Sequence, residues 1–114
     1  LGLVGSEMCI RDKLAEYDRE TYEDTQVVFR EGTAQYQKLL TRLQQVAVPA
    51  RLAGPHRTLV HDFAAFTATC EAMTASLKPD LEVDVPAFNA SEKAQDETIQ
   101  KFTKQIQKIS LILQ

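Results

Sequence analysis

The sequence lacks the long apolar run and the basic charge that would place it in several common classes of protein. No apolar stretch approaches the roughly 18 residues that a membrane-spanning helix needs. The net charge is −3, which gives no general attraction to nucleic acid or to anionic membranes. The apolar start, residues 1–5, is shorter than the roughly 7–15 residues of a signal-peptide core, and no basic residue precedes it.

Motifs of cofactor and metal chemistry are missing as well. There is no tryptophan, and the two cysteines, Cys9 and Cys70, do not form a haem-attachment Cys-x-x-Cys-His motif. The chain has no Glu-x-x-His pair of the di-iron bundles, and its histidines, His56 and His61, are five residues apart rather than four. We therefore predict no cofactor, no metal and no enzymatic activity.

What is present is helical periodicity in a chain long enough for one domain. From Lys13 to Val46, one set of positions recurs in steps of three and four, which predicts a helix over 13–46. The set is Leu14, Tyr17, Thr21, Thr25, Val28, Gly32, Tyr36, Leu39, Leu43 and Val46. Within it, Gly32 either weakens the helix or permits close approach of a neighbouring helix.

A second stripe follows the turn at Pro49 and predicts a helix over 51–78. Its positions alternate steps of four and three without a break, which indicates near-parallel helix packing. They are Leu52, His56, Leu59, Phe63, Phe66, Cys70, Met73 and Leu77. Cys70 lies among apolar positions of this stripe, so we interpret it as a small core residue.

Residues 79–88 alternate apolar and charged positions, but a lone strand has no partner, so we expect a loop. Asn89, with Glu92 three residues later, then predicts the cap of a third helix over 90–113. The stripe of this helix consists of Gln95, Ile99, Phe102, Ile106, Ile109 and Leu113. Three such helices predict an all-α, antiparallel up-down-up bundle, either complete or a fragment of a four-helix bundle.

In this topology the charges separate along the bundle. One end receives Lys38, Arg42, Arg51, Arg57, Lys101, Lys104 and Lys108, with Asp62 as the main acidic exception. The other end collects Glu16, Asp18, Glu20, Glu23, Asp24, Asp80, Glu82, Asp84, Glu92, Asp96 and Glu97. The separation is either a solvated surface matched to the helix dipoles or a basic end that meets an anionic polymer or lipid surface. Exposed aromatics do not interleave with these bases, so we predict no nucleic-acid partner.

One polar residue interrupts the second stripe. His56 lies on it near the start of the helix, where it is either a ligand or base, or a partly buried and hydrogen-bonded histidine. His61 is off the stripe, and we expect it to be solvated.

The opening residues carry a resemblance of their own. Residues 3–12, "LVGSEMCIRD", resemble the translation of a transposase adapter used in sequencing-library preparation, although Lys13 stands where that adapter would encode Ser or Arg. The resemblance implies that residues 1–12 are not native and that the domain occupies 13–114. The chain also ends in "ISLILQ" without a cap, as a helix cut before its end would. We therefore expect truncation at both ends, so that a targeting segment would lie outside this sequence.

Residues 39–77 are similar to uncharacterised bacterial lipoprotein and envelope domains. The similarity rests on a leucine-rich helix end, a proline turn and a histidine that opens a second helix, carried by Leu39, Leu43, Pro49, His56, Leu59 and Phe63. It implies an extracytoplasmic, non-enzymatic bundle with a structural or binding role, whose partner is an anionic envelope polymer, a lipid surface or another helix. The alternatives are a fragment of a four-helix extracytoplasmic sensor domain of a membrane receptor, and a metal or cofactor bundle.

Overall fold

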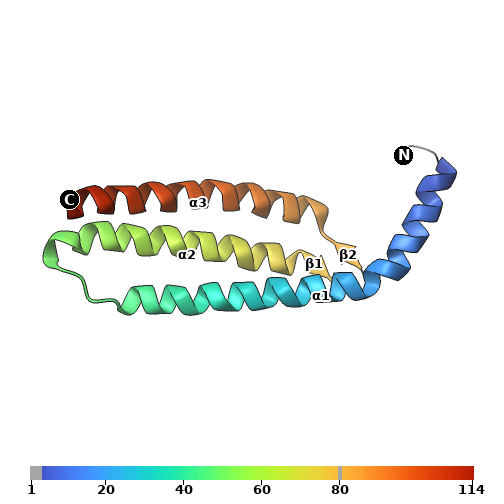
Figure 1. The fold of residues 1–114 in the computed structure, drawn as a ribbon, viewed down its shortest axis with the longest axis horizontal. Helices are drawn as coiled ribbons and strands as arrows, with labels where there is room; N and C mark the ends of the chain where they lie inside the picture. The colour runs from blue at the N-terminus through green and yellow to red at the C-terminus, as the bar shows by residue number, and fades with distance from the viewer. Residues whose placement is uncertain (1–3, 80) are drawn as a thin grey trace.

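The chain folds into three antiparallel helices with one short hairpin, which confirms the predicted all-α bundle (Figure 1). The computed structural model describes the backbone of residues 4–79 and 81–114, and the side chains of residues 19–79 and 81–114. The elements are α1 (Val4–Gln45), the 3₁₀ helix η1 (Ala50–Leu52), α2 (Ala53–Ala75), β1 (Leu77–Lys78), β2 (Glu82–Val83) and α3 (Val85–Leu113). The side chains of the adapter-like stretch, of the stripe positions Leu14 and Tyr17 and of the predicted acids Glu16 and Asp18 lie outside the described part of the structure, as does Asp80.

The first two helices differ from prediction at their boundaries. α1 begins at Val4 rather than at residue 13, and no proline interrupts the sequence between these points. The turn at Pro49 leads first into η1, so that α2 begins at Ala53 rather than at residue 51. α2 then ends at Ala75 instead of residue 78.

The predicted loop over 79–88 is wrong, because part of it pairs with the residues that follow α2. β1 and β2 are antiparallel, with Leu77 opposite Val83 and Lys78 opposite Glu82. The chain leaves α2 at the buried residue Ser76, whose hydroxyl donates to the Met73 carbonyl at 2.6 Å. Its own carbonyl accepts from the Asp84 amide at 2.8 Å, which brings the two strands together.

The start of α3 also differs from prediction. Asp84, not Asn89, caps the helix, and its carboxylate accepts from the Ala87 amide at 3.1 Å. Pro86 lies in the first turn, where a missing N–H is tolerated and the fixed φ favours the helix. Asn89 and Glu92 therefore lie inside α3 rather than at its start.

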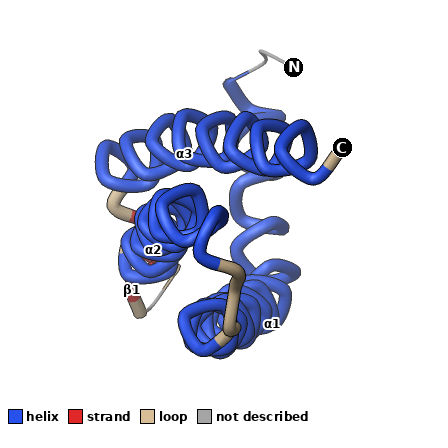
Figure 2. Tube along the Cα trace, turned by 90° about the vertical axis from the view of Figure 1, so that its left-hand side faces the viewer, coloured by secondary structure: helices blue, strands red, loops and turns tan. Residues whose placement is uncertain are grey.

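The core lies along α2, which is the central helix. α1 and α3 pack on α2 from opposite directions in the end-on view (Figure 2). Phe63, Phe66 and Cys70 form the buried cluster, and Leu40, Leu43 and Phe102 pack against it. The buried positions Leu52, Phe63, Phe66, Cys70 and Met73 all belong to the predicted second stripe, which is confirmed at these five residues.

Hydroxyl and amide groups fasten α1 to the rest of the fold. The Thr33 and Thr74 hydroxyls lie 3.0 Å apart between α1 and α2. At the hairpin, the Tyr22 hydroxyl lies 2.8 Å from the Lys78 carbonyl and 2.6 Å from the Glu82 carbonyl, and its single hydrogen donates to one of them at a time. These contacts hold the hairpin against the first half of the described part of α1.

The predicted stripes of the two outer helices are only partly covered. Val28 and Leu39 of α1 are exposed, as is Val46 directly after this helix, and on α3 so are Ile99, Ile106 and Leu113. The buried residues of α3 are instead Ser91 and Gln105. Each of these finds a hydrogen-bond acceptor, Ser91 in its own helix and Gln105 in the Pro55 carbonyl of α2. α3 therefore contacts α2 partly through polar side chains. Much of the apolar stripe of α3 lies next to this contact and not within it.

Candidate anion-binding end of the bundle

The antiparallel order brings the predicted bases to the same end of the molecule. The last turns of α1, the 3₁₀ helix η1, the start of α2 and the second half of α3 lie together there (Figure 1). We call this the basic end, defined by Lys38 and Arg42 of α1, Arg51 of η1, Arg57 of α2, and Lys101, Lys104 and Lys108 of α3. All seven side chains are exposed. The structure thus places every predicted base where solvent and ligands can reach it.

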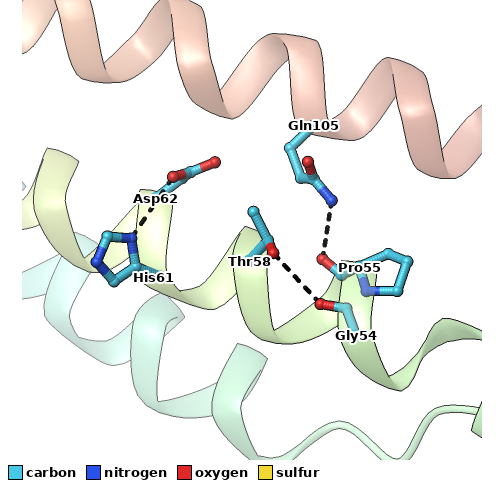
Figure 3. A network of polar contacts seen from close by, with 6 residues as sticks. All are labelled: Gly54, Pro55, Thr58, His61, Asp62 and Gln105. Carbon is cyan, nitrogen blue, oxygen red and sulfur yellow. Dashed lines mark hydrogen bonds and ion pairs between the residues drawn. The ribbon is translucent and has the colours of Figure 1, made fainter.

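A buried amide positions α3 at this end. Gln105 donates from Nε2 to the Pro55 carbonyl at 3.0 Å, which ties the second half of α3 to the first turn of α2 (Figure 3). Successive helix residues are about 100° apart around the axis. With Gln105 held toward α2, Lys104 lies to one side of this contact, where it is exposed. The apolar anchor of the same end is Leu52, which is buried at the end of η1.

The acidic exception at this end has a partner of its own. The Oδ1 atom of Asp62 lies 3.7 Å from the Nδ1 atom of His61 (Figure 3). The Asp62 side chain is only 14% exposed. Within residues 19–79 and 81–114 this is the one contact of ion-pair geometry, and it is an ion pair only when His61 is protonated. The Asp62 side chain is largely covered, whereas the seven bases are exposed, so a ligand at this end meets the bases first.

Helix-dipole matching accounts for few of these bases. The dipole acts within the first and last turns of a helix. Arg42 lies in the last turn of α1, but α3 has no basic residue in its last turn, and neither α2 nor α3 has an acid in its first turn. Lys101, Lys104 and Lys108 therefore lie too far from the end of α3 to be explained as dipole partners.

The two histidines have different surroundings. His56 is half-buried on α2, and its Nε2 atom is buried without a hydrogen-bond partner in the described structure. Of the two alternatives given for His56, the structure shows the partly buried position but no hydrogen bond at Nε2 within the described residues. His61 has an exposed side chain, as predicted. In the described part of the chain, no group of three or more His, Cys, Asp or Glu side chains is arranged to hold a metal ion.

Cys70 is part of the core rather than of a reactive site. Its thiol is buried beside Phe66, and the Gln95 amide donates to the sulfur at 3.4 Å. The core interpretation of Cys70 agrees with this geometry.

The sequence did not identify two polar residues that hold the fold together, Gln105 at the basic end and Tyr22 at the hairpin. Gln105 occurs three residues after Phe102 and four before Ile109, so its spacing marks it as inward-facing, although its polarity conceals this. Tyr22 carries no comparable signal, because its partners are backbone carbonyls of the hairpin. Desolvation raises the pKa of the Tyr22 phenol, and the nearby Glu82 carboxylate raises it further.

Comparison with protein-family models, with curated proteins and with solved structures finds no match to this chain. Within the described residues, every helix is too short or too polar to cross a lipid bilayer.

Proposed function

We propose that this chain is a non-enzymatic helical-bundle module of the bacterial cell envelope that binds phosphate-bearing envelope material through its basic end. One observation carries the proposal: bases from four separate elements are exposed at one end of a chain whose net charge is −3. The envelope setting is supported by the resemblance of residues 39–77 to envelope domains. Phosphate groups occur both on lipid head groups and on envelope polymers, and the basic end suits either source.

The strength of such binding follows from the number of bases that engage. Each Lys or Arg near an anionic surface contributes about 1 kcal/mol. Four engaged bases then give about 4 kcal/mol, which corresponds to a dissociation constant of about 1 mM. Exposed charges further apart than about 8 Å are largely screened at physiological salt, so the acids at the hairpin end do little to cancel the attraction. The binding is expected to be weak, fast and sensitive to salt.

The experiment compares two triple variants that remove the same charge. Arg51→Ala/Arg57→Ala/Lys104→Ala empties part of the basic end, and Arg19→Ala/Arg30→Ala/Lys93→Ala removes exposed bases elsewhere. Both are compared with wild type by co-sedimentation with phosphatidylglycerol vesicles, with phosphatidylcholine vesicles as the neutral reference. We expect the first variant to bind about 100-fold more weakly, since three bases contribute about 3 kcal/mol. The second variant should bind like wild type.

Soluble polyphosphate distinguishes the source of the phosphate. If it competes with vesicles for wild type, the basic end recognises phosphate irrespective of its carrier. If binding persists against polyphosphate, the lipid surface is the ligand. Equal retention of wild type and the basic-end variant on anionic vesicles would contradict the proposal.

A further inference from the structure

The two outer helices leave an apolar surface uncovered between them. We call it the open flank and define it by Val28, Tyr36 and Leu39 of α1 and by Ile99 and Ile106 of α3. Val28 is 62% exposed, Leu39 46% and Ile106 45%, although all five residues belong to stripes that repeat at helical spacing. Helical spacing places Leu39 on the same face of α1 as Val28, and Ile99 and Ile106 on the same face of α3 as Gln95, so these residues border one side of the bundle. Exposed apolar residues gathered on one side are typical of an interaction site.

A groove of about 270 Å³ deepens this flank. Val28, Gly32 and Tyr36 of α1 form one wall, Gln95 of α3 lies on the other side, and the floor includes the buried Met73 of α2. The groove is therefore bounded by all three helices.

Gly32 shows that no helix of this chain fills the space. A Cβ atom built on Gly32 would meet nothing within 4 Å, so packing inside the chain does not require glycine there. The open side of this glycine instead leaves room for close approach by a helix from another molecule.

The charges beside the flank indicate the orientation of its occupant. Asp24, Glu31 and Arg42 are separated by seven and eleven residues, so they lie along one edge of α1. By spacing, this edge adjoins Val28 and Leu39. Across the flank, α3 carries Glu92 and Asp96 near its start. The acids thus lie at the hairpin end of the flank, and Arg42 lies at the basic end.

We propose that two copies of this chain associate through their open flanks in antiparallel orientation. A two-fold axis across the flank brings Arg42 of each copy beside the acidic, hairpin end of the other. A parallel pair would instead place acids beside acids and arginine beside arginine. Closed two-fold dimers are also the commonest assemblies of soluble chains.

The dimer leaves much of the basic end accessible. Lys101 and Lys108 each follow a flank residue, Ile99 and Ile106, by two positions, which is about 200° around the helix. These lysines therefore lie on the side of α3 away from the flank. Arg42 is the one base that both proposals use. The inference otherwise stands independently of the proposed anion binding, because the remaining residues and the readouts differ.

Sedimentation equilibrium of the full chain, from low to high micromolar concentration, tests the association. The double variant Val28→Glu/Ile106→Glu places a charge on each half of the flank and should raise the dimer dissociation constant by about tenfold or more. The matched control is Val27→Glu/Leu111→Glu, which changes neighbouring exposed aliphatic residues outside the flank. The control should dimerise like wild type, and both variants should keep the helical circular dichroism of wild type. A monomeric wild type, or equal weakening in both variants, would overturn the inference.

Crosslinking tests the orientation. In a Cys9→Ser/Cys70→Ala background, Asp24→Cys and Arg42→Cys chains are prepared separately, mixed and treated with a flexible bis-maleimide. The antiparallel dimer predicts that products joining position 24 of one chain to position 42 of the other predominate. Predominance of 24–24 and 42–42 products would overturn the antiparallel arrangement. Neither result changes the vesicle experiment, so failure of this inference is distinguishable from failure of the proposed function.

Discussion

Phe63 of α2 forms ring pairs with aromatic residues of both outer helices, and replacing it with leucine should weaken the whole bundle. Its ring centroid lies 5.2 Å from that of Phe102 on α3, 6.1 Å from that of Tyr36 on α1 and 6.0 Å from that of Phe66. Leucine keeps most of the apolar volume but loses all three ring pairs. Aromatic pairs contribute about 0.5–1.5 kcal/mol each beyond simple burial.

The partly exposed position of Tyr36 moves that pair to the low end of this range. We therefore expect Phe63→Leu to lower the free energy of unfolding by about 2–3 kcal/mol. A domain of this size has a total of about 5–15 kcal/mol, so the change is large but leaves the protein folded. Urea unfolding, followed by circular dichroism and extrapolated linearly to water, measures it.

Two comparisons make the Phe63 prediction specific. Phe88→Leu is the matched control, because Phe88 is half-buried and joins no ring pair within the described part of the chain. It should cost about 1 kcal/mol or less. A double-mutant cycle of Phe63→Leu with Phe102→Leu should give a coupling of about 1 kcal/mol. If Phe63→Leu costs no more than Phe88→Leu and the coupling is zero, the role given to Phe63 is refuted.

Three further predictions concern the cap, the hairpin and the basic end. Asp84→Ala should lower the free energy of unfolding by about 1 kcal/mol in urea unfolding, whereas Asn89→Ala should change it little. If Asn89→Ala were the more destabilising variant, Asn89 and not Asp84 would be the helix cap. The folded-state pKa of Tyr22 is raised above its ordinary value of 10.0, so its contribution is fully present below pH 10.0 and is lost as the pH rises through the raised pKa. The stability difference between wild type and Tyr22→Phe should therefore shrink above pH 10.0 in alkaline unfolding curves, and a difference that grows would show the opposite sign. Gln105→Leu should cost about 1 kcal/mol because the bond to the Pro55 carbonyl is lost, and an unchanged unfolding midpoint would show that this bond does not hold α3.

Periodicity predicted the central helix well because α2 has neighbours on two sides. Phe63, Phe66 and Met73 lie on a central helix that is covered by α1 on one side and by α3 on another. Their burial therefore follows from helical spacing alone. The stripes of α1 and α3 were harder to interpret. Spacing identifies the apolar face of an amphipathic helix, but it does not say which neighbour covers that face, and Val28 and Ile106 remain uncovered.

Local competition explains the other differences between sequence and structure. Leu77 continues the periodicity of α2, yet it pairs with Val83 because Ser76 ends the helix through its own hydrogen bonds. Asp84 and Asn89 are both acceptable caps, and Pro86 in the first turn decides between them.

The basic end, by contrast, followed from topology. Antiparallel helices joined by short connections determine which ends meet, so the shared position of Arg42, Arg57 and Lys108 was predictable without any side-chain detail. The contact of Gln105 with Pro55 was not, because a buried amide on an otherwise apolar face has no distinctive sequence pattern.

The most direct test of the proposed function is to locate the contact with an anionic surface residue by residue. Amide signals of the isotopically labelled chain are followed by NMR while phosphatidylglycerol nanodiscs are added, with phosphatidylcholine nanodiscs as the reference. The proposal predicts broadening or shifts confined to residues 38–57 and 101–108, reversed by added salt, with residues 82–97 unchanged. Perturbations centred on residues 82–97, or equal effects with neutral nanodiscs, would contradict it.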